Sequence, residues 1–343
     1  MSDHTIVHIP GDGIGPEVSD ATLAVLEAAQ APLDFVTRYA GQTAFDHGHR
    51  DLLPEETLES IRQHHVALKG PCTTPVGGGF SSVNVALRKA LNLYAAVRPV
   101  RSLPGVTTRF SDVDLIVIRE NTEGLYSGIE NRITDGVVVS MKVATRGASR
   151  RIARWAFRYA ARRRRAKVSL FHKANIMKLT DGMMLEETRA IHDLDYPNIA
   201  YESVIIDAGC MRLVRDPTQF DIILGENLYG DILSDLCAGL VGGLGVTPGA
   251  NIGDDDAVFE AVHGSAPDIA GQNLANPLAL IMSAVMMLNH LGETRRCAKS
   301  TAAAERVKQA YNKALADGCT TKDLGGALGT REFAQALIDR LEG

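Results

Sequence analysis

Three arginines and two small polar residues occur where they could bind a substrate with several carboxylates. Ser82, Asn84 and Arg88 lie in one stretch with a helical pattern, and Arg98 and Arg119 follow it. On a helix, Asn84 and Arg88 share one face. Because the planar guanidinium fork matches a carboxylate, three arginines suggest a polycarboxylate ligand. Taken singly, each arginine also fits a solvated surface charge, and Ser82 fits a helix N-cap.

Two aspartates, Asp231 and Asp235, could bind a divalent cation. Their spacing of four residues places both carboxylates on one helical face, where they repel each other unless something neutralises them. Mg²⁺ or Mn²⁺ would do so, since both prefer carboxylate and water oxygens. Asp207, which closes an earlier predicted strand, is a third candidate ligand. The pair also fits a structural role, in which it stabilises a helix start.

Tyr126 and Lys173 could exchange protons with a substrate. Lys173 follows a short apolar strand, and a lysine that is desolvated or close to other cations can titrate near neutral pH. From the residues alone, Lys173 also fits a surface lysine and Tyr126 a tyrosine at the edge of the core.

The elements that must position these residues alternate between short β-branched strands and amphipathic helices, a pattern typical of an α/β protein. The sequence predicts strands at 5–9, 66–68, 113–118, 168–171 and 203–206. It predicts helices at 16–29, 83–93, 148–164, 231–241, 276–291 and 301–316. The apolar run 278–288 falls short of the roughly 20 residues of a membrane span, so it predicts a buried helix.

Length and composition restrict the class of protein. A chain of 343 residues, 45% hydrophobic, is expected to fold into two lobes, and no linker separates them. The net charge of −5 argues against nucleic-acid or membrane-surface binding. The N-terminus lacks a secretory pattern and the five cysteines are scattered, so we expect a cytoplasmic location and reduced thiols.

Two further motifs fit structural roles. The glycine-rich stretch 11–15 invites a dinucleotide-binding interpretation, but Pro16 occupies the position of the third glycine. We therefore expect a tight turn between a strand and a helix. Four consecutive arginines at 162–165 end a predicted helix and are expected to form a solvated face.

Taken together, the motifs resemble those of the β-decarboxylating dehydrogenases, the family of isocitrate, homoisocitrate, isopropylmalate and tartrate dehydrogenases. The most specific motifs are at residues 11–17, 119–124, 227–235, 263–271, 275–277 and 321–326. The resemblance is greatest to NAD-dependent isocitrate dehydrogenases of the catalytic type. It implies a two-domain α/β/α fold, distinct from a Rossmann fold. Residues 1–95 and 245–343 would form a large coenzyme-binding domain, and residues 96–244 a small domain with a dimer-forming segment at about 124–146.

The same resemblance assigns roles to residues. It implies that Arg88, Arg98 and Arg119 bind substrate carboxylates and that Lys173 and Tyr126 transfer protons. It also implies that an Mg²⁺ or Mn²⁺ ion is held by Asp207, Asp231 and Asp235. Lys173 and Asp207 are expected to reach the site of the neighbouring subunit, so a homodimer would be the smallest active unit.

Substrate choice depends on Ser82 and Asn84, which resemble the pair found in isocitrate enzymes. Isopropylmalate enzymes carry apolar side chains there, and burying an isopropyl group against two polar residues would cost about 1 to 3 kcal/mol for each. Homoisocitrate, which has one more methylene, is harder to exclude. A regulatory, non-catalytic subunit is a further alternative, but such relatives tend to lose part of the Tyr, Lys and Asp set.

NAD is the coenzyme that the resemblance implies. Asp268 would accept hydrogen bonds from the adenosine ribose, whereas NADP-using relatives carry Lys followed by Tyr where this chain has Asp268 and Ile269. A carboxylate near a 2′-phosphate would be repelled by about 4 kcal/mol per unit charge. The remaining expected coenzyme residues are Thr74, Glu260, His263, Gly264 and Asn276.

Overall fold

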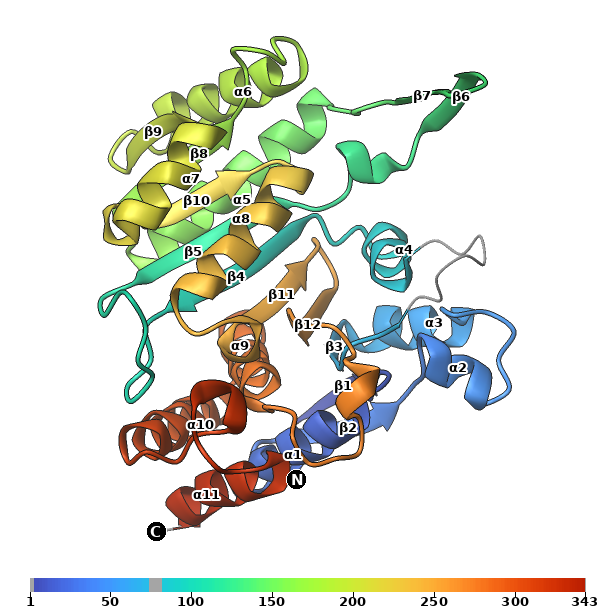
Figure 1. The fold of residues 1–343 in the computed structure, drawn as a ribbon, viewed down its shortest axis with the longest axis vertical. Helices are drawn as coiled ribbons and strands as arrows, with labels where there is room; N and C mark the ends of the chain where they lie inside the picture. Colours follow the sequence, from blue (N-terminus) through green and yellow to red (C-terminus); the bar gives the residue numbers. More distant parts are fainter. Residues whose placement is uncertain (1–2, 74–81, 343) are drawn as a thin grey trace.

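A ten-stranded sheet with helices on both faces forms the centre of the molecule (Figure 1). The computed structural model describes residues 3–73 and 82–342, so the predicted coenzyme residue Thr74 lies outside the described residues. The sheet order is β2-β1-β3-β12-β11-β4-β5-β10-β8-β9. Its strands are β1 (His4–Ile9), β2 (Leu33–Thr37), β3 (Val66–Lys69), β4 (Ala95–Arg101), β5 (Asp114–Glu120), β8 (Lys167–His172), β9 (Ala200–Ile205), β10 (Ile222–Gly225), β11 (Pro248–Ile252) and β12 (Ala257–Ala261).

Eleven α-helices accompany the strands of the described chain. They are α1 (Gly15–Ala28), α2 (Gln42–Asp46), α3 (Glu55–His64), α4 (Val83–Ala90), α5 (Arg146–Arg163), α6 (Thr180–Asp195), α7 (Ile206–Arg215), α8 (Asn227–Leu240), α9 (Leu278–Thr294), α10 (Ala298–Ala316) and α11 (Thr330–Glu342). Strand neighbours run parallel except at β12–β11, β11–β4 and β4–β5. The α/β/α architecture expected from the sequence is confirmed.

Two lobes share this sheet (Figure 1). We call the part with β1–β3, β11, β12, α1 and α9–α11 the large lobe, and the part with β5, β8–β10 and α5–α8 the small lobe. One hydrophobic cluster extends through both, from Ile6 in β1 to Ile223 in β10. Because sheet and core are continuous, the boundaries at residues 95 and 244 remain a prediction.

A two-stranded arm projects from the small lobe (Figure 1). It consists of β6 (Glu130–Thr134) and β7 (Val137–Ser140), and every residue of both strands is exposed. The exposed side chains include Ile133, which is 64% exposed, and Val138, which is 57% exposed. A hairpin of two strands is at best marginally stable alone in water, so this arm needs a surface to pack on.

The observed helices refine the predicted boundaries. The helix predicted at 83–93 ends at Ala90, because Asn92 adopts a left-handed conformation with φ of 47°. Helix α8 begins at Asn227 rather than Asp231, since Glu226 caps it by accepting the Tyr229 N–H. The prediction that Asp207 closes a strand is wrong, because Asp207 lies in the first turn of α7.

The two structural interpretations of short motifs are tested directly. Gly11 and Gly13 have φ of 83° and 59°, and a Cβ on Gly13 would lie 2.0 Å from the Ser265 carbonyl oxygen. The tight turn is therefore confirmed. Three arginines of the run, at 162–164, are exposed as predicted, whereas Arg165 is half-buried and pairs with Asp114.

The predictions of a buried helix and of reduced thiols also hold. Nearly every residue of the run 278–288 is buried within α9. None of the five cysteines, all of which the structure describes, forms a disulfide. Among the described residues, no helix has both the length and the apolar character needed to cross a membrane.

Helix α8 packs unusually close to β5. A Cβ on Gly230 would lie 2.5 Å from the Cβ of Arg119, whereas a Cβ on Gly239, in the same helix, would have no neighbour within 4 Å. Only a residue without a side chain permits this approach at position 230.

This contrast gives a matched pair of variants. Gly239→Ala should raise the free energy of unfolding by about 0.5 to 1 kcal/mol, because alanine favours helix. Gly230→Ala should lower it by about 1 to 3 kcal/mol, because the methyl group would push α8 away from Arg119. Urea unfolding of the two variants measures the difference, and equal effects would contradict the close packing.

Candidate active site

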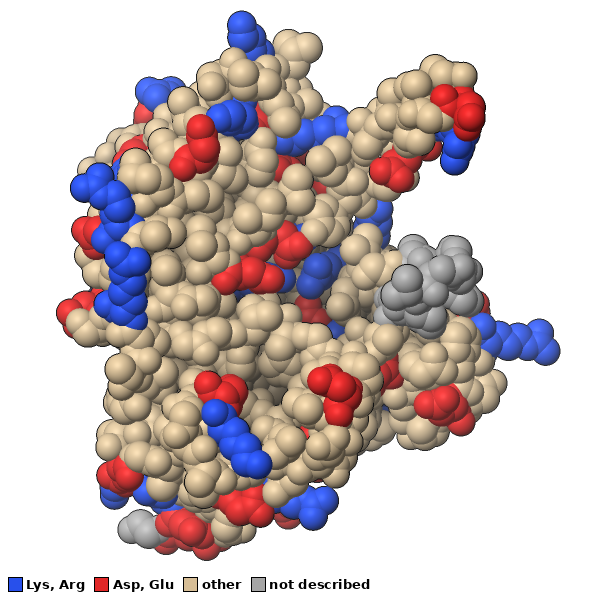
Figure 2. Space-filling model, viewed as in Figure 1, with Lys and Arg blue, Asp and Glu red and all other residues tan. Residues whose placement is uncertain are grey.

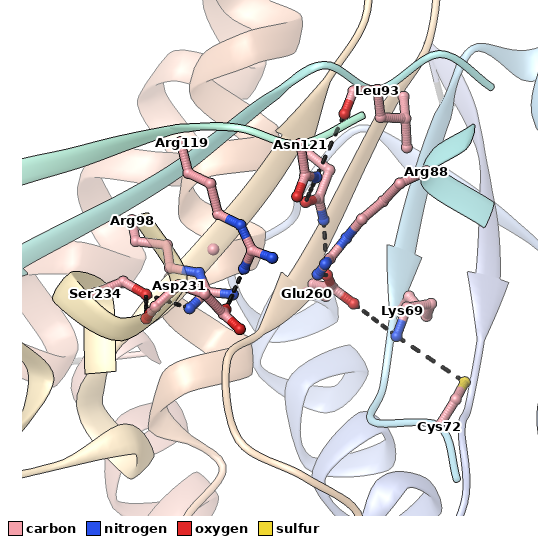
Figure 3. Close-up of polar contacts among 12 residues, drawn as sticks. Lys69, Cys72, Arg88, Leu93, Arg98, Arg119, Asn121, Asp231, Ser234 and Glu260 are labelled. Atoms are coloured by element: carbon pink, nitrogen blue, oxygen red, sulfur yellow. Dashed lines mark hydrogen bonds and ion pairs between the residues drawn. The ribbon is translucent and has the colours of Figure 1, made fainter. Parts of the chain in front are cut away.

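Predicted substrate and coenzyme residues meet in one cavity. Its volume is about 100 Å³, and its lining includes the predicted substrate residues Asn84, Arg88 and Arg98 and the predicted coenzyme residues Glu260, His263 and Gly264. Figure 2 shows that the molecular surface is hollowed between the two lobes, where acidic and basic side chains both gather. Figure 3 shows how the charged side chains of this region converge.

Arg119 and Asp231 form the central ion pair of the site. Arg119, near the end of β5, is 2% exposed, and its Nη1 contacts Asp231 Oδ1. Its Nε and Nη2 donate to Asn227 Oδ1 at 2.9 and 2.6 Å. Burial lowers the pKa of Arg119 to about 10, although Asp231 opposes this shift. The guanidinium therefore remains charged at neutral pH.

Arg98 joins both aspartates of α8. It lies on β4, donates to the Ser234 hydroxyl and contacts Asp235 Oδ1 at 3.1 Å and Asp231 Oδ1 at 3.6 Å. Burial would raise the pKa of Asp231, but the Arg119 guanidinium and the Tyr126 hydroxyl lower it below its usual value. Two cations thus keep Asp231 ionised, and Asp231 and Asp235 face the same arginine.

Tyr126 lies against this ion pair, in the short 3₁₀ helix Leu125–Ser127. Its hydroxyl donates to Asp231 Oδ2 at 2.5 Å, and Arg119 Cζ lies 4.8 Å from its ring centroid. Burial and the neighbouring Asp231 raise the pKa of Tyr126. The phenol therefore holds its proton at neutral pH and can donate it.

Glu260, a predicted coenzyme residue, forms ion pairs with two cationic side chains. Lys69 Nζ lies 2.7 Å from Glu260 Oε2, and Arg88 Nη2 lies 2.9 Å from Glu260 Oε1 (Figure 3). Asn251 also donates to Oε1 at 2.7 Å. Burial would raise the pKa of Glu260, but Lys69 and Arg88 hold it far below its usual range. Glu260 therefore orients Arg88 toward the cavity.

Sequence reasoning missed Lys69, which is 1% exposed. The available signal was its place directly after the buried strand residues 66–68, where a lysine needs a buried counter-charge. The partners Asn227 and Ser234 lay within a motif already singled out, but only the structure shows that they bind arginines.

The predicted substrate pair at the start of α4 lies partly in the cavity. Asn84 lines it, and its buried Oδ1 has no hydrogen-bond partner among the described residues. Because the amide nitrogen is a donor, Asn84 can bind a carboxylate. Ser82 precedes α4 and is exposed, and its side chain makes no capping hydrogen bond in the described chain.

The remaining coenzyme residues lie on the segment after β12. His263 and Gly264 line the cavity, whereas Asp268 and Ile269 lie further on, in the 3₁₀ helix Pro267–Ile269, with Asp268 exposed. Asn276 has other hydrogen bonds. Its Nδ2 donates to Asp323 Oδ2 and its Oδ1 accepts the Leu278 N–H at the start of α9. Asn276 Oδ1 thus satisfies the backbone N–H of the first residue of α9.

Lys173 and Asp207 lie apart from the other candidate residues. Lys173 Nζ contacts Asp207 Oδ1 at 2.8 Å, and the Asp207 side chain is 69% exposed. Among the described residues, no group of three or more His, Cys, Asp or Glu side chains could hold a metal ion. Within one chain, Asp231 and Asp235 come together and Asp207 does not join them.

Comparison with known proteins gives a consistent result. A family profile described as isocitrate/isopropylmalate dehydrogenase matches residues 5–337. The chain is 52% identical over 339 residues to the mitochondrial NAD isocitrate dehydrogenase catalytic subunit 5 of Arabidopsis thaliana, which covers 98% of this chain and 88% of that relative. It is also 52% identical over 310 residues to the chloroplastic 3-isopropylmalate dehydrogenase of Solanum tuberosum, covering 90% of this chain and 84% of that relative.

A solved structure extends the agreement to three dimensions. The isocitrate dehydrogenase of Methylococcus capsulatus superimposes with a TM-score of 0.93 at 50% identity, covering 99% of this chain and all of that one. The two plant relatives carry organelle names, so they give no support to the expected cytoplasmic location. Family profile, sequence identity and backbone agree, and the chain belongs to the isocitrate/isopropylmalate dehydrogenase family.

Proposed function

We propose that the protein catalyses the NAD-dependent oxidative decarboxylation of isocitrate to 2-oxoglutarate and CO₂. The observation that carries this proposal is the polar cavity lined by Asn84, Arg88 and Arg98 together with His263 and Gly264. Its arginines can bind substrate carboxylates beside the residues proposed for the coenzyme. The identity to a catalytic subunit named for NAD and isocitrate supports the same reaction.

In this proposal, Arg88, Arg98 and Arg119 bind the substrate carboxylates. Lys173 receives the proton of the substrate hydroxyl, and Tyr126 donates a proton to carbon after CO₂ has left. The raised pKa of Tyr126 supports a donor role, because the phenol stays protonated until a carbanion-like carbon develops. When bound, NAD would supply a hydride acceptor and a divalent cation would supply positive charge for the substrate oxygens.

The residues that would hold Mg²⁺ or Mn²⁺ are Asp231 and Asp235, with Asp207 of a second chain. Their chemistry fits a hard cation, since all three offer carboxylate oxygens. The side chains of Asp235 and Asp207 are 55% and 69% exposed, so both can receive further ligands.

Three alternatives compete with the isocitrate assignment. Isopropylmalate has support from the potato relative, and homoisocitrate differs by one methylene. The position of Asn84 beside Arg88 favours a carboxylate over an isopropyl group, because an apolar group would leave the Asn84 amide without a hydrogen-bond partner in the cavity. The presence of Tyr126, Lys173 and the three aspartates favours a catalytic subunit over a regulatory one.

A substrate panel tests this assignment. With NAD and Mg²⁺, kcat/KM should be highest for isocitrate, followed by homoisocitrate and then isopropylmalate. Asn84→Leu should lower kcat/KM for isocitrate by about tenfold or more, the effect of one lost hydrogen bond to a charged group. Steady-state kinetics on the three acids checks both results. A wild-type preference for isopropylmalate would overturn the proposal.

The preference for NAD is proposed from Asp268. The exposed carboxylate would accept hydrogen bonds from the ribose hydroxyls of NAD and repel the 2′-phosphate of NADP. In Asp268→Lys/Ile269→Tyr, the ratio of kcat/KM for NAD to that for NADP should fall by at least about a hundredfold. Ile269→Tyr alone is the control and should change the ratio little. An unchanged ratio in the double variant would remove Asp268 from the coenzyme site.

We further propose a homodimer whose two sites are each built from both chains. Exposed apolar residues support this, since they include Ile133 and Val138 of the arm, Leu179, Met211 of α7 and Ile232 of α8. Lys173 and Asp207 also support it, because they pair with each other at the surface and form no described contact with Asp231.

Mixing inactive variants tests the shared sites. Lys173→Met and Asp231→Asn should each be inactive, but a refolded equimolar mixture should recover about a quarter of wild-type activity. Half of the dimers are then mixed, and each has one intact site. Lys173→Met mixed with Asp207→Asn is the matched control. It should stay inactive, because both residues serve the partner. Recovery in the control, or none in the first mixture, would contradict the arrangement.

A further inference from the structure

A second, larger cavity lies behind the candidate active site. Its volume is about 510 Å³, within the range of small-molecule sites. Successive side chains of a strand point to opposite faces, so Val97 and Ile116 line this cavity while Arg98 and Arg119 point to the active site. Figure 1 shows α8 in front of β4 and β5, and α5 behind them.

The floor of this rear cavity is apolar. Val97, Ile116 and Phe259 contribute buried side chains from three strands of the sheet. Trp155 and Tyr159 of α5 form one wall, with their rings stacked at 5.1 Å and 17°. Such a surface can bury the aliphatic or aromatic body of a ligand.

The rim of the rear cavity carries excess positive charge. Five arginines and three carboxylates line it. Two of the carboxylates are in ion pairs, Glu293 with Arg163 and Asp114 with Arg165, and Asp254 accepts a hydrogen bond from the neutral Tyr94 hydroxyl. His290 adds no charge at neutral pH, because burial lowers its pKa to about 4.

Three arginines of the rim therefore have no carboxylate partner among the described residues. Arg101 donates only to the neutral Tyr311 hydroxyl and the Asn312 amide. Arg158 and Arg162 are exposed on one face of α5, four residues apart, and no described carboxylate lies within ion-pair distance of either. A cationic rim over an apolar floor is unexpected in a chain with net charge −5.

We propose that the rear cavity binds an organic anion with an apolar body, such as an aryl or acyl acid. The body would lie on Val97, Ile116 and Trp155, and the acidic group would pair with Arg158 and Arg162. Charge complementarity selects an anion, and the floor selects against small hydrophilic acids such as the proposed substrate. Because α5 belongs to the small lobe and Met286 of α9 to the large lobe, the ligand contacts both.

The fluorescent dye 8-anilinonaphthalene-1-sulfonate has this chemistry, one anionic group on an aromatic body. Titrated into the full-length protein, it should bind saturably with one molecule per chain. Saturating NAD and isocitrate should not displace it, since the two cavities lie on opposite faces of the sheet. Displacement by either would place the dye in the active site and overturn the proposal.

Variants identify the site. Arg158→Ala/Arg162→Ala should weaken dye binding by about tenfold or more, since both charged partners are lost. Arg154→Ala is the matched control, an exposed arginine of α5 outside the cavity, and should bind like wild type. Asn289→Phe, which fills the cavity, should also weaken binding. All three should retain isocitrate oxidation, and wild-type dye affinity in the double and the filling variants would reject the rear cavity.

Discussion

The interaction on which the rest of the site depends is the buried pairing of arginines with carboxylates. Arg119 is almost wholly inaccessible to water, and its charge is tolerable there because Asp231 and Asn227 face it. Arg88 is held in the same way by Glu260, whose second oxygen binds Lys69. These pairs keep guanidinium groups charged and oriented before any substrate arrives, so less ordering remains for binding.

The sequence predicts the fold better than it predicts the contacts of the site. The sequence predicted helices α1, α4, α5 and α8–α10 and the buried strands 113–118 and 168–171, because their hydrophobic pattern is regular. It did not predict helices α2, α3, α6, α7 and α11. Strand β4, which carries Arg98, was not predicted, because Pro99 lowers its apparent strand propensity. Strand β11 was not predicted for the same reason, since it begins with Pro248 and Gly249. In β4 and β11, pairing with the neighbouring strands outweighs the low strand propensity of the local sequence.

The sequence identified the candidate site residues, but it did not identify the residues that they contact. Motif resemblance singled out Asp231 and Glu260, yet the Tyr126 and Lys69 contacts join residues more than a hundred positions apart. Asn276 illustrates the limit, since its side-chain amide bonds to Asp323 and to the Leu278 N–H. A sequence shows which chemistry a residue offers, whereas long-range packing decides which partner receives it.

Strands β4 and β5 serve two cavities at once, with neighbouring residues such as Val97 and Arg98 on opposite faces. A shift of either strand by a single residue would exchange these sets, placing guanidinium groups on the apolar floor and aliphatic side chains among the acids. A single insertion or deletion within β4 or β5 would therefore disrupt both cavities together, a constraint that does not apply to the arm at residues 130–140, whose strands are exposed throughout.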